Sequence, residues 1–169
     1  MTTRTVTWHG ILTGTPDSTT DLYLPLQSIQ ATLRESTDSY ISVVVSDTLQ
    51  AEVNARPNGI IEIYKTKDGG TPALVYSVNF NNLRLDQGTR SGTLTLSGRS
   101  TASFGTPATV VLTDVVKDNL QTSGLRELEI GAHNDIKPTD TADYDSVQTV
   151  IDLVEITVND NGTLIRIAE

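Results

Sequence analysis

Apolar and polar residues alternate with a period of two along most of the chain, which is typical of β-strands with one buried face. Residues 93–96 read Thr-Leu-Thr-Leu, whereas residues 40–46 form a continuous run, β-branched at its centre, which predicts a strand that packs on both faces. Clusters of Gly, Pro, Asn and Asp separate such segments, as turns do. The pattern predicts an all-β, mainly antiparallel fold, built as a split β-barrel or a barrel-like sandwich with one short helix.

The predicted strands follow from these runs. We expect them at residues 6–13, 40–46, 60–66, 74–80, 83–85, 92–97, 109–113, 147–158 and 163–168. Residues 22–33 are also extended, but the apolar face shifts phase between Leu26 and Ile29, which predicts a bulge, and Pro25 indicates an edge position or a strand start. Residues 115–128 fit neither the helical nor the strand period clearly.

One window has a helical pattern. Leu49 and Val53 lie four residues apart within residues 48–55, after Ser46 or Asp47 as the N-terminal cap. The following Arg-Pro-Asn-Gly stops the helix, and Gly59 would supply a positive φ if the turn needs one. The main turns are expected at residues 14–20, 67–70, 86–88 and 159–162, and a longer loop at residues 97–107.

The length of 169 residues and mass of 18.2 kDa fit one domain. We expect residues 1–169 to form a single β-barrel domain, with residues 133–146 as an exposed polar loop and residues 147–169 as a C-terminal β-hairpin. The sequence contains no repeat of fixed period.

Composition excludes several functions. Without cysteine there is no disulfide, thiolate metal site or cysteine nucleophile. A net charge of −9, with only 12 Lys and Arg, argues against nucleic-acid binding, whereas an acidic surface suits solubility or a passage through which DNA slides. No apolar run could span a bilayer, and the N-terminal residues lead into a strand. We therefore expect a soluble protein that is made in a cytoplasm, without membrane insertion.

The histidines lack the neighbours that catalysis or metal binding needs. His9 lies beside Trp8 in a predicted strand, so we interpret it as a strand-face side chain and Trp8 as a core side chain in preference to an interface one. His133 and Asp135 could belong to a Ser-His-Asp set, but no nucleophile motif accompanies them.

Other candidate sites are similarly incomplete. The acidic residues Asp135, Asp140, Asp143 and Asp145 offer oxygen ligands for Ca²⁺, but their spacing is not that of an EF-hand, so a solvated loop is favoured. Glu127 and Glu129 alternate on a predicted strand, with few aromatic residues to form a sugar platform. Gly69-Gly70 is a hairpin turn, and Gly98-Arg99-Ser100 lacks the lysine of a P-loop. We predict no catalytic residue, no metal site and no cofactor.

Three segments resemble those of a known family: residues 24–34 (LPLQSIQATLR), residues 39–45 (SYISVVV), and Ser97-Gly98-Arg99-Ser100 after a Thr/Leu strand. The family is that of the tail-tip hub and distal-tail (baseplate) β-barrel proteins of tailed bacteriophages. The resemblance extends over residues 5–115. The resemblance implies a structural virion protein that forms a ring with copies of itself, connects the tail tube to the baseplate and surrounds the DNA channel. Its partners would be itself and other tail or baseplate proteins, and its location the virion tail.

Many hub proteins are longer, so this chain could be a minimal hub, a tube-adaptor ring or another virion component, such as a head–tail connector or a capsid decoration protein. A non-catalytic β-sandwich that binds carbohydrate or protein, or an unfamiliar enzyme, stays an alternative. For assembly, we expect residues 133–144 and exposed strand edges to supply the interface.

Overall fold

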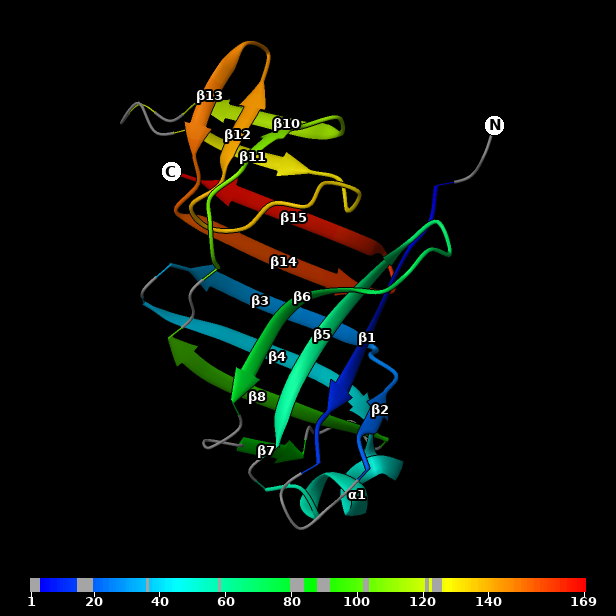
Figure 1. Ribbon diagram of the computed structural model, residues 1–169. Coiled ribbons are helices and arrows are strands. Elements are labelled where there is room, and N and C mark those ends of the chain that lie inside the picture. Colours follow the sequence, from blue (N-terminus) through cyan, green and yellow to red (C-terminus); the bar gives the residue numbers. More distant parts are fainter. Residues whose placement is uncertain are drawn as a thin grey trace. The chain divides into compact units, whose positions relative to one another are not determined.

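The computed structural model describes residues 4–14, 20–35, 37–57, 59–79, 84–87, 92–101, 104–120, 122 and 126–169. Strands dominate and are mostly antiparallel, and one short helical segment is present, which confirms the predicted fold class (Figure 1). The chain divides into two compact units, one with Met1–Ile29 and Ile41–Arg99 and the other with Gln30–Tyr40 and Ser100–Glu169. In the described residues the sheets are sandwich-like and form no closed barrel.

The first unit contains a four-stranded antiparallel sheet in the order β2-β1-β5-β6. Its strands are β1 (Val6–Leu12), β2 (Leu22–Leu24), β5 (Ile60–Lys67) and β6 (Ala73–Asn79). The unit's second layer places β4 (Asp38–Ser46) beside β8 (Thr93–Thr101) and β7 (Arg84–Gln87), and the four-stranded sheet crosses in front of β4 and β8 (Figure 1).

Alternation of side chains creates the core of this unit. Every second residue of β4 and β5 is buried, and the residues of β4 between them are half-buried, so residues 40–46 bury one face fully and not both. The buried apolar side chains of the two layers include Leu12, Leu24, Ile61, Ile63 and Val78 from one and Ile41, Val43, Val45, Leu94 and Leu96 from the other.

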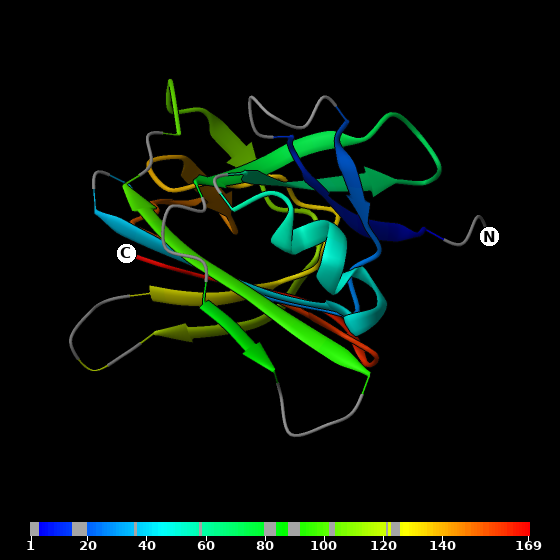
Figure 2. The same ribbon diagram turned by 90° about the horizontal axis from the view of Figure 1, so that it is seen from below.

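The helical segment follows β4 directly and consists of η1 (Asp47–Leu49) and α1 (Gln50–Asn54) (Figure 2). Of the two cap candidates, Ser46 is the cap, because its hydroxyl accepts a hydrogen bond from the Thr48 N–H at 3.3 Å. Val53 is fully buried and anchors the helix to the unit.

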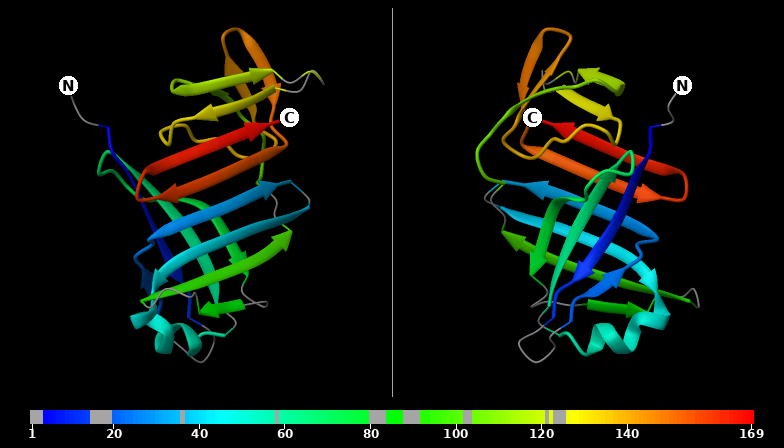
Figure 3. Two further views of the ribbon diagram at one scale, coloured as in Figure 1. Left: turned by 180° about the vertical axis from the view of Figure 1, so that it is seen from behind. Right: turned by 45° about the vertical axis from the view of Figure 1, so that its right-hand side comes forward.

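The second unit contains neighbouring strands in the order β10-β11-β15-β14, followed by β3 (Ser28–Arg34) (Figure 3, left). Their bounds are Val115–Leu120 for β10, Arg126–Ile130 for β11, Gly162–Ala168 for β15 and Leu153–Asn159 for β14. A three-stranded sheet has the order β13 (Val147–Val150), β12 (Thr141–Tyr144), β9 (Thr109–Val111), in which β12 and β9 are parallel.

Several boundaries differ from the sequence-based prediction. The phase shift after Leu26 is a break between β2 and β3 and not a bulge. The strand expected at residues 147–158 is divided into β13 and β14. Strand β8 continues to Thr101 and so includes the start of the expected loop. The ambiguous residues 115–128 contain two antiparallel strands, β10 and β11. The predictions for residues 15–19, 80–83 and 88 lie outside the described residues.

No helix among the described residues is long and apolar enough to cross a membrane. The assignment of all 169 residues to one domain stays a prediction.

Position 59 has no room for a side chain larger than that of glycine. It is not among the positive-φ residues, but a Cβ atom there would lie 2.6 Å from Leu12 Cδ1 and 2.8 Å from the Thr13 carbonyl oxygen. Because backbone cannot yield as a flexible side chain does, we predict that Gly59→Ala lowers the free energy of unfolding by about 1–3 kcal/mol.

Urea denaturation would measure this loss. The matched control is Gly69→Asn, since Gly69 has φ of 71°, a Cβ atom added there would have no neighbour within 4 Å, and asparagine tolerates this conformation. Equal stability of the Gly59→Ala protein and the wild type would contradict the steric explanation.

Candidate assembly surface

Strand β10 is a terminal strand with unusually exposed apolar side chains. It is the first strand in its sheet order, so its outer edge has no strand partner within the described part of the chain. Val116 is 67% exposed and Leu120 70% exposed. Monomeric proteins usually protect such edges with charged side chains or proline, because free N–H and C=O groups recruit other strands.

The charged side chains of β10 contact its own sheet. Lys117 Nζ lies 3.4 Å from Glu129 Oε1 on β11, and Asp118 accepts hydrogen bonds from the Arg126 guanidinium, with Nε at 3.0 Å. This guanidinium holds the pKa of Asp118 below its usual value and also lies over the Tyr144 ring, 5.5 Å from its centroid. Both charges are therefore paired within the sheet, while the Lys117 side chain stays 58% exposed.

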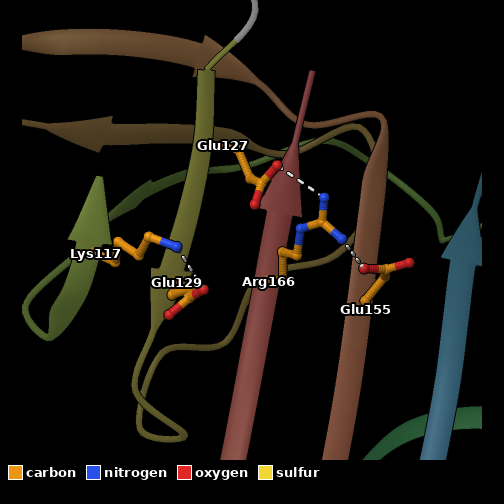
Figure 4. Close-up of polar contacts among 5 residues, drawn as sticks. All are labelled: Lys117, Glu127, Glu129, Glu155 and Arg166. Carbon is orange, nitrogen blue, oxygen red and sulfur yellow. Dashed lines mark hydrogen bonds and ion pairs between the residues drawn. The ribbon is translucent and has the colours of Figure 1, made fainter. Parts of the chain in front are cut away.

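A row of alternating charges continues across the sheet (Figure 4). The register places Lys117 opposite Glu129, Glu129 opposite Arg166, and Arg166 opposite Glu155. Arg166 donates to Glu155 and to Glu127, each at 2.8 Å, and the hydrogen bond to Glu127 is the main cause that raises the pKa of Arg166. Cross-strand pairs of opposite charge stabilise sheets modestly.

Exposed apolar residues also occur on the outer strands of the three-stranded sheet. Val147 and Val150 on β13 are 47% and 62% exposed, and Val111 on β9 is 66% exposed. Leu120 and Val147 line one open groove together with Asp118 and Arg126. We define β10, β13 and this groove as the candidate assembly surface, because it combines apolar contact area with strand edges.

A second feature lies on the four-stranded sheet of the first unit. The His9 ring stacks between Tyr23 and Tyr64, with centroid distances of 5.4 and 5.3 Å and interplanar angles of 27° and 7°. The Tyr64 hydroxyl donates to Glu62 Oε2 at 2.8 Å. Trp8 is half-buried on the same strand as His9, and Lys65 Nζ lies 5.7 Å from its ring centroid.

The residues that the sequence offered as candidate sites lie on different elements of the structure. His9 lies on a strand face and Gly69 in the β5–β6 turn, while Gly98 is buried within β8. Glu127 and Glu129 lie on β11 in ion pairs with Arg166 and Lys117. Among the described residues, no group of three or more His, Cys, Asp or Glu side chains could hold a metal ion.

Residues 133–146 differ from the exposed loop that the sequence suggested. Asn134, Pro138, Asp140 and Ala142 are buried, and residues 141–144 form β12. Asp140 accepts hydrogen bonds from the Ala108 N–H at 2.9 Å and the Lys137 N–H at 3.0 Å, so its carboxylate fixes the backbone. Asp135 and Asp145 are exposed.

Sequence reasoning missed Asn134, which fixes the same segment. Its amide oxygen accepts from the Thr113 N–H at 3.2 Å, and its nitrogen donates to the carbonyls of Asp114 and Gly131. No local pattern distinguishes this asparagine from one in a solvated loop.

Comparisons with known proteins give a likeness of fold. Models of protein families give no match, and curated protein sequences give no significant similarity. The chain is similar in structure to a tail protein from Neisseria meningitidis MC58, with a TM-score of 0.54, 8% identity, and 96% of this chain and 95% of that chain covered. It is equally similar to the 43 kDa tail protein of prophage MuSo2 from Shewanella oneidensis, with a TM-score of 0.54, 7% identity and 96% of each chain covered. The fold is thus one that also occurs in a tail protein and in a prophage tail protein.

The Tyr64–Glu62 hydrogen bond should be visible in a pH titration. This bond, then burial and the negative charges of Glu62 and Asp21, raise the pKa of Tyr64 above its usual value. The protonated hydroxyl therefore stabilises the folded state below the pKa of an unfolded tyrosine, near 10, and this contribution is lost as pH rises through the folded pKa.

We predict that Glu62→Gln lowers the pKa of Tyr64 toward its usual value, measured by NMR of the tyrosine ring carbons. Glu52→Gln, on α1, serves as a control for the loss of one carboxylate. An unchanged Tyr64 titration in the Glu62 variant would refute the assignment.

Proposed function

We propose that the protein is a non-catalytic structural subunit of a bacteriophage tail. In this proposal it forms a ring with copies of itself at the tail tip or tube end, connects the tube to the baseplate and surrounds the DNA channel. The fold supports a tail role, since its likeness to two phage tail proteins extends over 96% of the chain.

The observation that carries the proposed self-assembly is the edge of β10, which has no strand partner among the described residues. Its charged residues bond to β11, while Val116 and Leu120 stay exposed. A strand of a neighbouring copy that paired with this edge would satisfy its N–H and C=O groups and cover these side chains. When such contacts are head to tail and the rotation closes, copies form a ring.

The charge of the chain supports a channel role without nucleic-acid binding. At −9 the protein repels phosphates, and a wall that must let DNA slide should not hold them. The proposed location is the virion tail, and the proposed partners are other tail or baseplate proteins in addition to its own copies.

The first test concerns self-assembly. We predict that Leu120→Lys weakens self-association by about tenfold or more, because it places a charge in the proposed contact. Light scattering over a series of protein concentrations would measure the mass. The control is Leu164→Lys, which also replaces an exposed leucine, 42% exposed, but on β15 between two paired strands. A wild-type protein that is monomeric at all concentrations and also inside the particle would contradict the ring.

The second test concerns the channel. In an assembled particle we predict that carboxylates outnumber Lys and Arg among the residues of this protein that face the channel, because a basic wall would retain DNA. Electron cryomicroscopy of the tail would identify those residues. A channel wall rich in Lys and Arg would count against the proposed position.

A further inference from the structure

We propose that the face of the four-stranded sheet carrying Tyr23, His9 and Tyr64 docks an arginine side chain of a different protein. We call these three residues with Glu62 and Asp21 the aromatic–acidic site. The inference rests on the proposed function for the kind of partner, a neighbouring tail protein, but the site itself is argued from its own contacts.

The ring stack leaves one aromatic face for a ligand. His9 lies between the two tyrosines, so it covers one side of the Tyr23 ring. Tyr23 comes from β2, the terminal strand of the sheet, and is 60% exposed. An exposed tyrosine held by a stacked neighbour has little side-chain entropy to lose on binding, which favours such residues as interface anchors.

The charges of the site are negative. Glu62 lies on the same strand as Tyr64 and accepts one hydrogen bond from it, although a carboxylate has about four acceptor positions. Asp21 directly precedes β2, two residues before Tyr23, and its carboxylate accepts a hydrogen bond from the Gly14 N–H at 3.1 Å. The lysines of β5 are at positions 65 and 67, which alternate to the opposite face, and Lys65 is only 4% exposed near Trp8.

An arginine side chain matches this combination best. Its guanidinium is planar, so it stacks on a tyrosine ring, and its N–H groups can donate to carboxylates at the same time. The second unit shows the same arrangement within one chain, where Arg126 lies over Tyr144 and donates to Asp118. A lysine ammonium would satisfy the charge but could not stack.

The partner is a different protein because several basic side chains of this chain are bonded within it and its net charge is negative. Arg56 donates to the carbonyls of Thr20 and Glu52, and Lys137 to those of Phe104 and Thr106. Lys117, Arg126 and Arg166 are in ion pairs with their own sheet. A second copy also carries the same net charge of −9, which opposes approach to an acidic site.

The test uses three blocked peptides, Gly-Arg-Gly-Arg-Gly and its lysine and citrulline analogues, at low ionic strength. Binding is followed by NMR shifts of the His9 and tyrosine ring signals. We expect the arginine peptide to bind at least about fivefold more tightly than the citrulline peptide, which is planar but neutral, with the lysine peptide between them. Equal binding of the arginine and citrulline peptides would overturn the proposal, because neutral stacking would then suffice.

Variants locate the contact. Tyr23→Ala and Glu62→Gln should each weaken binding of the arginine peptide about fivefold, whereas Tyr23→Phe should retain it. Thr66→Ala, on β5 but opposite Thr7 and not opposite His9, is the matched control. Unchanged binding by both Tyr23→Ala and Glu62→Gln would place the peptide elsewhere and refute the site.

The same samples separate this inference from the proposed ring. Tyr23→Ala should leave self-association intact, and Leu120→Lys should leave peptide binding intact. If Leu120→Lys fails to weaken self-association while peptide binding depends on Tyr23, the assembly surface is wrong and the aromatic–acidic site stands. The reverse result would keep the assembly surface and remove this site.

Discussion

Backbone pairing between strands that bury only one face is the constraint on which the structure depends. The chain has no cysteine, so cross-strand hydrogen bonds and the packing of alternate aliphatic residues hold each unit together. The same alternation leaves a second set of side chains on the solvent side of these strands. Those outer residues contribute little to the core, so they are free to serve other purposes, and the two units use them differently.

On the second unit, Arg166 and its neighbours form a row of opposite charges, whereas on the first unit His9 stacks between two tyrosines. A neutralised charged row binds water well and has little attraction for another protein. An aromatic row with two carboxylates retains both apolar area and net charge. The solvent faces therefore differ in chemistry even though the strands beneath them follow one pattern.

The fold class could be predicted because alternation is a local signal that repeats many times, as in β8. Residues 115–128 gave no clear period, since β10 is exposed on nearly its whole length and lacks a buried face. The buried Asn134 and Asp140 could not be recognised, because their burial depends on backbone groups far along the chain, such as the Ala108 N–H. The row of charges and the ring stack each extend across several strands, so they depend on the register between strands. The residue pattern of a single strand does not specify that register.

The division of the chain into two units affects how the protein can be synthesised and dissected. Neither unit is one continuous segment, because residues 30–40 of the second unit lie between the two segments of the first. The chain therefore passes between the units three times, and a single proteolytic cut cannot release either one intact. During translation the tip of the β3–β4 hairpin emerges early, but the strands that complete its unit follow only after residue 100. This part of the nascent chain therefore stays without its packing partners until the strands after residue 100 have been synthesised.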